Sequence, residues 1–292
     1  MHPINSLSLA PNVNVWLANT HHPRVLHVFN HACNLINERR EVLSIVTPQI
    51  GNGPFNLVIE DDILFSETLP ARSLISIRSD QLDLGDLNIS TDKARLWSPR
   101  PDWEMLHTRR DKILNRITSL RAPTGAMRRE FGIASSQSTF LAMTLPLPNC
   151  QSLSLDFTSA LANSDNSSAP KQTSKLAGLG VGLTPAGDDF ILGAILAVWI
   201  IHPPEIASVL AEEIANTAAP LTTSLSAAWL KSAGKGEAGI LWHEFFDALV
   251  SGDAASVQLK IVKLLSVGET SGSDALAGFL GTFFSFKERI IE

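Results

Sequence analysis

The sequence predicts an α+β protein: a mostly β N-terminal part, either a sheet or a small barrel, followed by a C-terminal helical, bundle-like domain. Up to about residue 98, short β-branched and apolar runs alternate with Pro, Gly, Asn and Asp, as in strands joined by turns. From Leu176 onward, apolar residues recur at helical spacing between breaks that contain Pro or Gly. We therefore expect a mainly β domain over 1–98, a helical connector over 99–175 and a helical domain over 176–292.

Six runs in the N-terminal part have the length and composition of strands. They span residues 13–18, 25–33, 41–47, 55–60, 73–78 and 94–97. On a strand, His27, His31 and Cys33 would share one face, which raises the question of a metal site. Zinc needs at least three ligands in a tetrahedral array, and no carboxylate or second cysteine follows at a recognisable interval. Partly buried histidines that bond to backbone groups are the favoured interpretation, and we predict no metal ligand there.

Helices are expected over 101–121 and through most of the chain after Leu176. The later ones span 185–201, 204–216, 222–232, 240–250, 254–265 and 274–288. Residues 122–150 are expected to hold one or two short helices or a strand. The polar run 163–170 has the composition of a connector, with a lid over the glycine-rich stretch that follows as the alternative.

The segment between Lys93 and Arg129 is basic in an otherwise acidic chain. It holds ten of the 23 Lys and Arg residues, although the formal net charge of the chain is −6. A solvated helix face is the usual explanation for such a run. The alternative is a docking surface for an acidic partner, or a field that steers anionic substrates without setting specificity. Reversing the charge of Arg109, Arg110 and Arg116 would separate the two interpretations.

The most distinctive stretch is Gly178-Leu-Gly-Val-Gly-Leu-Thr-Pro-Ala-Gly-Asp-Asp-Phe-Ile-Leu-Gly193. Its alternating glycines, among them Gly180 and Gly182, allow positive φ and close approach of a ligand to the backbone. Thr184 and Pro185 then form a helix start, with Thr184 as the expected N-cap. A helix start supplies free N–H groups and about half a positive charge, so this stretch has the outline of an anion site.

Asp188 and Asp189 lie in the first turn of that helix. They suit the helix dipole, but they would repel an anionic ligand unless a cation or a proton lay between. This favours Mg²⁺, a carboxylate that accepts from a substrate amide, or a raised pKa. The structural alternative is that the carboxylates cap the helix and the glycines permit close packing.

The motif recurs near the C-terminus. Gly187-x-Asp189-x-Ile191-x-Gly193 is matched 85 residues later by Gly272-x-Asp274-x-Leu276-x-Gly278. With Ser271 before the second copy, both present hydroxyl, glycine and aspartate around a helix start. We therefore expect the two helix starts to converge on one pocket. The alternative is that Gly193 and Gly278 serve only to let two helices pack tightly.

Four hydroxyls follow Pro220 at another predicted helix start, at Thr222, Thr223, Ser224 and Ser226. One of them would cap the helix. A neutral, hydroxyl-rich wall suits a urea-like or amide ligand, whose donors and acceptors both need partners after desolvation. Thr222 and Thr223 are therefore candidate substrate contacts.

Three of these stretches resemble the AllH-like family. They are Gly180-Val-Gly-Leu-Thr-Pro-Ala-Gly-Asp-Asp189, Thr222-Thr-Ser-Leu-Ser226 and Gly268-Glu-Thr-Ser-Gly-Ser-Asp274, with Gly53-Pro-Phe-Asn-Leu-Val58 as a weaker N-terminal match. The resemblance covers most of the chain. It implies a subunit of an oxamate carbamoyltransferase of anaerobic allantoin breakdown, a route of purine nitrogen use. Such a subunit would act with AllF-like and AllG-like subunits on oxalurate and phosphate, giving oxamate and carbamoyl phosphate. Val181 and Ala186 depart from the family's usual proline and serine.

Composition excludes several other classes of protein. A pI near 5.8 gives no basic domain for nucleic acid. Only Cys33 and Cys150 occur, so no disulfide framework is expected. The longest uncharged apolar run, 190–201, is twelve residues, whereas a membrane span needs about twenty. The N-terminus lacks the pattern of a signal peptide, so we expect a cytoplasmic protein with no membrane partner.

Two functions remain open on the sequence. The preferred one is a carbamoyltransferase-type enzyme subunit, in which Asp188, Asp189 and Asp274 are the catalytic candidates. The substrate-binding candidates are Gly180, Gly182, Thr184, Gly187, Thr222, Thr223, Ser271 and Gly272. Mg²⁺ is the one cofactor considered, and phosphate could attack a carbamoyl carbon directly, since no Ser-His-Asp or Cys-His arrangement is apparent. The alternative is a non-catalytic metabolite-binding or scaffold subunit of a larger complex.

Overall fold

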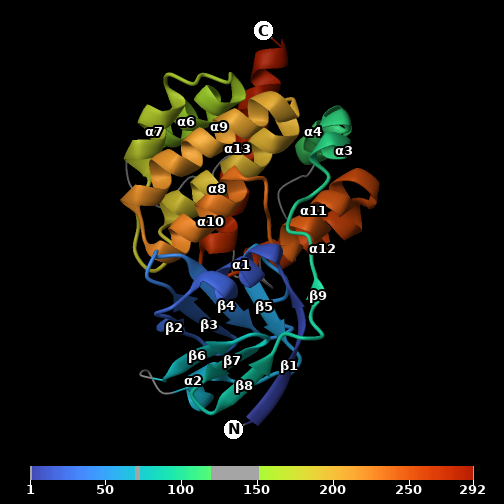
Figure 1. Ribbon diagram of the computed structural model, residues 1–292. Helices are drawn as coiled ribbons and strands as arrows, with labels where there is room; N and C mark the ends of the chain where they lie inside the picture. Colours follow the sequence, from blue (N-terminus) through green and yellow to red (C-terminus); the bar gives the residue numbers. More distant parts are fainter. Residues whose placement is uncertain (1, 70–72, 120–150, 292) are drawn as a thin grey trace. The chain divides into compact units, whose positions relative to one another are not determined.

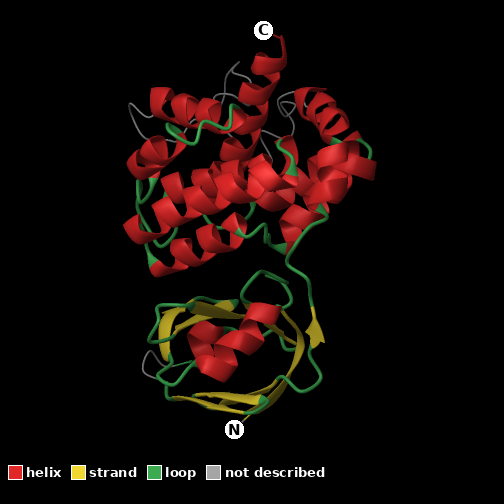
Figure 2. Ribbon diagram, turned by 45° about the horizontal axis from the view of Figure 1, so that its top comes forward, coloured by secondary structure: helices red, strands yellow, loops and turns green. Residues whose placement is uncertain are grey.

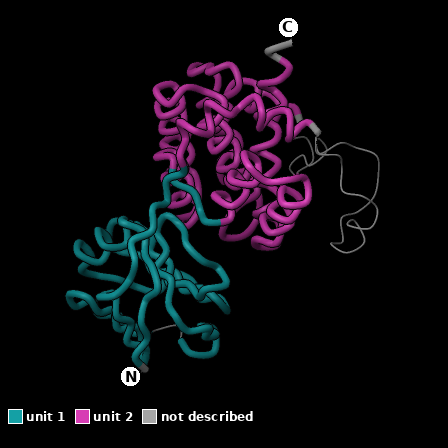
Figure 3. Tube along the Cα trace, turned by 90° about the vertical axis from the view of Figure 1, so that its right-hand side faces the viewer, with its two compact units in different colours: residues 1–101, 237–240 teal, residues 102–236, 241–292 magenta. Residues whose placement is uncertain are grey.

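The computed structural model of the chain describes residues 2–69, 73–119 and 151–291. The chain divides into two compact units, which Figure 3 shows in different colours. The first comprises Met1–Pro101 with Glu237–Ile240, and the second comprises Asp102–Gly236 with Leu241–Glu292. Figure 2 shows that the strands belong to the N-terminal part and that helices make up the rest. The predicted α+β class is therefore confirmed.

The first unit is a nearly closed β barrel of nine strands (Figure 1). The strands are β1 (His2–Leu9), β2 (Arg24–Val28), β3 (Ala32–Ile36), β4 (Val42–Val46), β5 (Asn56–Ile59), β6 (Ile75–Arg78), β7 (Gln81–Leu84), β8 (Leu87–Ser90) and β9 (Arg95–Leu96). Their order is β2-β3-β4-β5-β1-β8-β7-β6, and β9 also pairs with β1. β1 holds the barrel together, because its first half pairs with β8 and its second half with β5. Within the β1–β5 pairing, the register shifts between Ser6 and Ser8.

The barrel core includes a helix where the sequence predicts a strand. Residues 13–18 lie in α1 (Pro11–Asn19), so the strand prediction is wrong. Val13, Trp16 and Leu17 are buried at helical spacing, while Val15 is 59% exposed. Val13, Asn14 and Val15 alternate apolar and polar side chains, which imitates the two-residue period of a strand. Phe65 of the short helix α2 (Phe65–Thr68) joins the same core.

The predicted strand 25–33 is two strands, β2 and β3, joined by a turn. The register of this hairpin pairs His27 with Asn34 and Val28 with Cys33. Since Cys33 and Asn34 are successive strand residues, His27 and Cys33 lie on opposite faces. The expectation that His27, His31 and Cys33 share one face is therefore wrong. Burial raises the pKa of the Cys33 thiol to about 12.

The second unit is helical, and every helix predicted after Leu176 is present. Its helices are α3 (Trp103–Thr108), α4 (Arg110–Ser119), α6 (Gln151–Ala162), α7 (Ala169–Leu176), α8 (Ala186–Ile201), α9 (Pro204–Ala218), α10 (Ser224–Gly234), α11 (Ile240–Ser251), α12 (Ala254–Leu265) and α13 (Ser271–Ile291). The predicted helix 101–121 is interrupted at Arg109, between α3 and α4. Asp102 caps α3 by accepting from the Met105 N–H at 2.9 Å. Cys150, Arg121, Arg128 and Arg129, like the elements expected over 122–150, lie outside the described residues.

Helix α8 runs through the middle of this unit, as its lack of charge after Asp189 predicts. All of its residues except Ala186 and Leu192 are buried. Its most extensive packing is against α13 (Figure 1). At the N-terminal ends, the hydroxyls of Thr184 and Ser271 lie 2.8 Å apart. At the C-terminal ends, the rings of His202 and Phe286 have centroids 6.2 Å apart. The two helices are therefore parallel and start at the same end of the unit.

Glycine lets these two backbones touch. A Cβ built on Gly193 would collide with the carbonyl oxygen of Ala275, and one built on Gly278 would collide with the carbonyl oxygen of Phe190. The close packing predicted for these two glycines is thus present. Because each helix contributes one glycine and one backbone contact, the pairing is symmetric about the crossing point.

We predict that Gly278→Ala destabilises the protein by about 1–3 kcal/mol or more, because the obstacle is backbone and cannot rotate away. Gly281→Ala is the matched control on the same helix, since a Cβ there would meet only the Thr158 Cγ2 methyl at 3.3 Å. Urea unfolding followed by circular dichroism measures both free energies. Equal stability of the two variants would contradict the proposed backbone contact.

Candidate functional site

The glycine-rich loop before α8 has the backbone that the sequence predicts. Gly178, Gly180 and Gly182 have φ of 74°, 117° and 94°. Val181 lies between the last two and is 93% exposed. Within the described part of the chain, no acceptor is paired with the N–H of Gly180, Val181 or Gly182. These N–H groups are therefore available to a ligand.

The start of α8 itself differs from the anion site that the sequence predicts. The Gly187 N–H donates to the Leu179 carbonyl at 2.8 Å, and the N–H groups of Asp188 and Asp189 donate to the Pro185 carbonyl at 2.9 and 3.2 Å. The expectation of free N–H groups at these positions is wrong, because the loop carbonyl of Leu179 accepts from the first and the carbonyl of Pro185, the N-cap residue, accepts from the other two as the first bonds of the helix. An anion at this end would use the loop N–H groups and that of Ala186, for which the described residues offer no acceptor.

Asp188 fastens the glycine-rich loop to the start of α10. Its carboxylate accepts from the Gly178 N–H at 2.8 Å and from the Thr222 hydroxyl. Burial raises the pKa of Asp188, and the bonds from Thr222 and Gly178 oppose that rise. Thr223 is the N-cap of α10: its hydroxyl accepts from the Ser226 N–H at 3.1 Å and donates to the Leu183 carbonyl at 2.6 Å. Asp188, Thr222 and Thr223 therefore position the loop.

Gly187 and Gly272 are close-packing positions. A Cβ on Gly187 would collide with the carbonyl oxygen of Leu176, and a Cβ on Gly272 with that of Leu264. The Gly272 N–H donates to the Val267 carbonyl at 3.0 Å, as Gly187 does to its own loop. The sequence repeat is thus a structural repeat, in which a helix end, a loop and the next helix start are arranged alike. Neither glycine presents an N–H to a ligand, although the sequence predicts both as substrate contacts.

Thr184 and Ser271 join the two helix starts through their hydroxyls, 2.8 Å apart. The N-cap of α8 is Pro185, with no side-chain cap, so the prediction of Thr184 as N-cap is wrong. The Thr184 hydroxyl instead contacts the Ser271 hydroxyl, at the start of the second copy of the motif. The predicted convergence of the two helix starts is confirmed by this contact.

Asp189 and Asp274 are equivalent residues of the two copies, and both are buried, with 7% and 5% exposure. One carboxyl oxygen of each, Oδ2, has no hydrogen-bond partner among the described residues. The pKa of Asp189 is raised to about 8: burial is the largest cause, the charges of Asp274 and Asp188 also raise it, and the hydroxyls of Ser271 and Thr184 oppose the rise. Burial likewise raises the pKa of Asp274, and the Thr270 hydroxyl opposes it. Two buried carboxyl groups thus lie close enough to resist being charged together.

In the described ranges, no group of three or more His, Cys, Asp or Glu side chains is placed to hold a metal ion. The positive ends of two helices also oppose a cation beside Asp189 and Asp274. The Mg²⁺ considered from the sequence stays a prediction.

Two comparisons with protein families bear on these residues. Residues 176–283 match the family described as oxamate carbamoyltransferase subunit AllH, and residues 5–96 match the AllH family N-terminal domain. The chain belongs to the AllH family. Comparison with curated proteins and with solved structures gave no match. The AllH match spans the glycine-rich loop, both helix starts and the hydroxyls of α10, so the candidate site lies wholly within it. The family's name describes its members as subunits of an enzyme, and a subunit implies partner subunits.

Thr270 lies at the second helix start and was not among the predicted substrate contacts. The structure adds it to the site, because its hydroxyl acts on Asp274, one helical turn further along the chain. The structure thus brings Thr184, Ser271, Asp189 and Asp274 together and leaves Thr270 beside them. It places Asp188, Thr222 and Thr223 on the neighbouring loop contact with α10.

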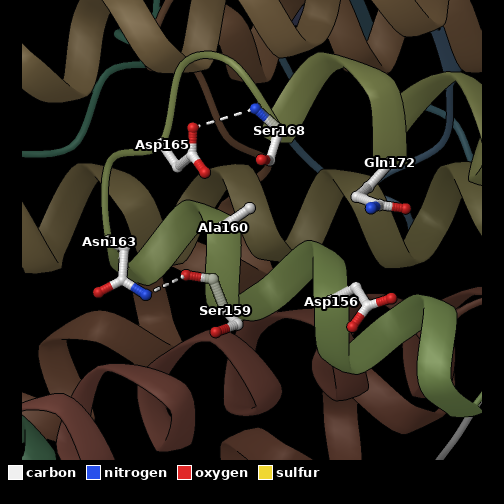
Figure 4. Close-up of a pocket in the computed structure, with 7 residues that line it drawn as sticks. All are labelled: Asp156, Ser159, Ala160, Asn163, Asp165, Ser168 and Gln172. Atoms are coloured by element: carbon white, nitrogen blue, oxygen red, sulfur yellow. Dashed lines mark hydrogen bonds between the residues drawn. The ribbon is translucent and has the colours of Figure 1, made fainter.

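A polar depression elsewhere on the helical unit includes none of these residues (Figure 4). It is lined by α6, the following loop and the start of α7, with Asp156, Asn163, Asp165 and Gln172 among its side chains. Asp165 is hydrogen-bonded within its own loop, where it accepts from the N–H groups of Ser167 and Ser168 at 3.0 and 3.1 Å.

Among the helices described, none is both long enough and apolar enough to cross a membrane.

We predict that stability falls as pH rises from about 4 to about 8, because Asp189 has a higher pKa in the folded chain than its unfolded value of about 3.9. The neutral carboxyl is the form that the fold favours, so the stabilisation is complete below the unfolded pKa and is lost as pH rises through the folded one. The slope from this group is at most about 1.4 kcal/mol per pH unit. In Asp189→Asn this dependence should become weaker, leaving the part that the raised pKa values of Asp188 and Asp274 contribute, and the variant should be more stable than the wild type at about pH 9.

Urea unfolding across this pH range provides the measurement. Asp247→Asn is the control, because the same change is made on an exposed helical residue for which the wild-type slope should persist. A slope that survives Asp189→Asn unchanged would show that other groups cause it.

Proposed function

We propose that this chain is the AllH subunit of an oxamate carbamoyltransferase that converts oxalurate and phosphate to oxamate and carbamoyl phosphate, in anaerobic allantoin and purine nitrogen use. The observation that carries the proposal is the buried pair Asp189 and Asp274, each with an unpartnered carboxyl oxygen, at two joined helix starts. The AllH family match supports the reaction class. AllF-like and AllG-like chains would be the partners, in the cytoplasm.

The site offers complementary groups to such a substrate. The free N–H groups of Gly180, Val181 and Gly182 suit a carboxylate or a phosphate. The carboxyl groups of Asp189 and Asp274 suit the carbamoyl amide, which must be paired once it is desolvated. In the reaction a phosphate oxygen forms a bond to the carbamoyl carbon and the carbon–nitrogen bond to the oxamate portion breaks. That nitrogen takes up the proton that phosphate gives up.

The second candidate function is a non-catalytic subunit that binds a metabolite or supports catalytic partners. The observation that favours it is that the N–H groups of residues 187–189 and the carboxylate of Asp188 are already hydrogen-bonded within the chain. Few polar groups at this helix start are then left to take part in a reaction. Both functions place the ligand at the same pair of helix starts. They differ in whether Asp189 and Asp274 affect turnover or only binding and assembly.

We predict that the isolated chain does not form carbamoyl phosphate and that activity appears only with its partner subunits, because the family's name describes its members as subunits of the enzyme. In the assembled complex, Asp189→Asn should lower kcat/KM by about tenfold or more, the cost of one charge-assisted hydrogen bond. Asp247→Asn is the control and should keep wild-type activity. Full activity of the Asp189→Asn complex would favour the non-catalytic function.

The basic segment needs a revised test, because two of its arginines act within the helical unit. Arg116 donates to the carbonyl of Ala248 near the end of α11 at 2.8 Å. Arg110 donates to the carbonyl of Ile201 at the end of α8 at 3.4 Å. Both stabilise helix C-termini, where cations are favoured. Reversing them would therefore change folding as well as any docking.

Arg109 and Lys112 are exposed members of this segment in the helical unit, and they provide the better variants. We predict that Arg109→Glu with Lys112→Glu weakens association with the partner subunits and makes it less salt-sensitive, because opposite charges steer docking. Analytical ultracentrifugation at two salt concentrations measures this. Lys171→Glu with Lys175→Glu, at two exposed lysines of α7, changes the net charge by the same amount and serves as the comparison. Unchanged association at low salt would leave the segment as a solvated helix face.

A further inference from the structure

We propose that Asp189 and Asp274 act as one carboxyl pair that shares a single proton and recognises a carbamoyl group. The charged carboxylate would accept a hydrogen bond from the carbamoyl N–H, and the protonated carboxyl would donate one to the carbamoyl oxygen. This inference rests on the proposed function for the chemical class of its ligand, and it assigns a distinct role to each member of the pair.

Geometry places the two side chains on the facing sides of α8 and α13. Asp189 precedes Gly193 by four residues, and Asp274 precedes Gly278 by four, so each aspartate shares a helix face with the glycine that contacts the other helix. The helices are parallel and joined at their starts by Thr184 and Ser271. The two carboxyl groups therefore lie beside each other, one turn from the crossing point.

Burial and missing partners point to a ligand. Both side chains are more than nine-tenths buried, and each has an Oδ2 atom without a partner among the described residues. A buried polar atom left unpaired costs about 1–3 kcal/mol in general, so such atoms in a native fold are normally paired by a ligand or by water. Two of them side by side offer one acceptor and, with a proton, one donor.

The charges around Asp189 and Asp274 favour one proton on the two carboxyl groups together. Each helix start contributes about half a positive charge, so the two together balance about one negative charge. Two ionised carboxylates would exceed this balance in a buried place. Across the described residues, no Lys, Arg or His forms an ion pair with Asp188, Asp189 or Asp274. The carboxyl group of Asp188 lies close enough for its charge to disfavour ionisation of Asp189, and the hydroxyls of Thr184, Thr270 and Ser271 beside the pair are neutral.

A singly protonated pair discriminates between an amide and a carboxylate. An amide presents a donor and an acceptor next to each other, which matches a carboxylate next to a carboxylic acid. A second carboxylate on the ligand would meet a site that already carries a negative charge. The pair thus selects the carbamoyl end of a small anion, leaving its acidic end for the loop N–H groups.

The test is calorimetric titration of the full chain with oxamate, which carries a primary amide, and with oxalate, which replaces that amide by a carboxylate. Oxamate should bind about tenfold or more tightly than oxalate, because the pair accepts an amide and repels a carboxylate. Titrations in two buffers of different ionisation enthalpy should show that oxamate binding takes up a proton at about pH 9 and none at about pH 6, since the pair must be singly protonated to bind. This comparison requires no variant.

Asp189→Ala and Asp274→Ala, which remove donor and acceptor alike, should each weaken oxamate binding by about tenfold or more, while Asp247→Ala leaves it unchanged. Thermal unfolding of each variant confirms that it is folded. The inference is overturned by absence of oxamate binding, by equal binding of oxalate, by the lack of proton uptake at about pH 9, or by binding that requires Mg²⁺.

The outcomes also separate this inference from the proposed function. If oxamate binds with proton uptake but the complex makes no carbamoyl phosphate, the singly protonated carboxyl pair is supported and the proposed reaction is refuted. Carbamoyl phosphate formation by a complex that carries Asp189→Asn and Asp274→Asn at wild-type rate would support the reaction and refute the pair.

Discussion

Contact between the backbones of α8 and α13 is the constraint on which the candidate site depends. At Gly193 and Gly278 each helix touches the carbonyl of the other, which no larger residue would allow. The pairing is parallel, so both helix starts lie at one end and equivalent residues of the two motif copies become neighbours. Asp189 and Asp274 are adjacent for this reason alone, although 85 residues separate them in the chain.

The parallel pairing has an electrostatic cost that the aspartates offset. Two helix starts side by side place two partial positive charges together, which is unfavourable without a compensating negative charge. Two buried carboxyl groups side by side are unfavourable for the opposite reason. The two helix starts and the two carboxyl groups stabilise each other when Asp189 and Asp274 together carry about one negative charge. The raised pKa of Asp189, to about 8, follows from the same balance, because burial and Asp274 disfavour the second charge.

The internal repeat made the convergence predictable. Gly, Asp and Gly recur at the same spacing in both copies, and such spacing fixes which residues share a helix face. Helices after Leu176 were also predictable, since Pro and Gly mark their ends. The pairing of the Gly187 N–H was not predictable, because it depends on how the loop folds its Leu179 carbonyl back over the start of α8. That closure is tertiary, and no local pattern encodes it.

The failures in the barrel have a different cause. Asn between valines in α1 imitates the period of a strand, and only the burial of Trp16 and Leu17 against the barrel core makes the helix preferable. β7 contains Asp83, a residue that strands usually avoid, so its sequence did not suggest a strand. In the fold that carboxylate accepts from Ser76 and Asn88 on the two flanking strands. Tertiary hydrogen bonds thus overrule the local preference.

The two copies of the motif are alike in packing but unlike in what they expose. The loop of the first copy is three residues longer between equivalent hydrogen bonds, from Leu179 to Gly187 against Val267 to Gly272. Only the first copy has Asp188 to fasten this longer loop, since Ser273 holds the equivalent position in the second. The free N–H groups of the loop therefore lie on one side of a carboxyl pair that is otherwise symmetric. A ligand that uses both features must have two different ends, an anionic group at the loop and a polar neutral group at the pair.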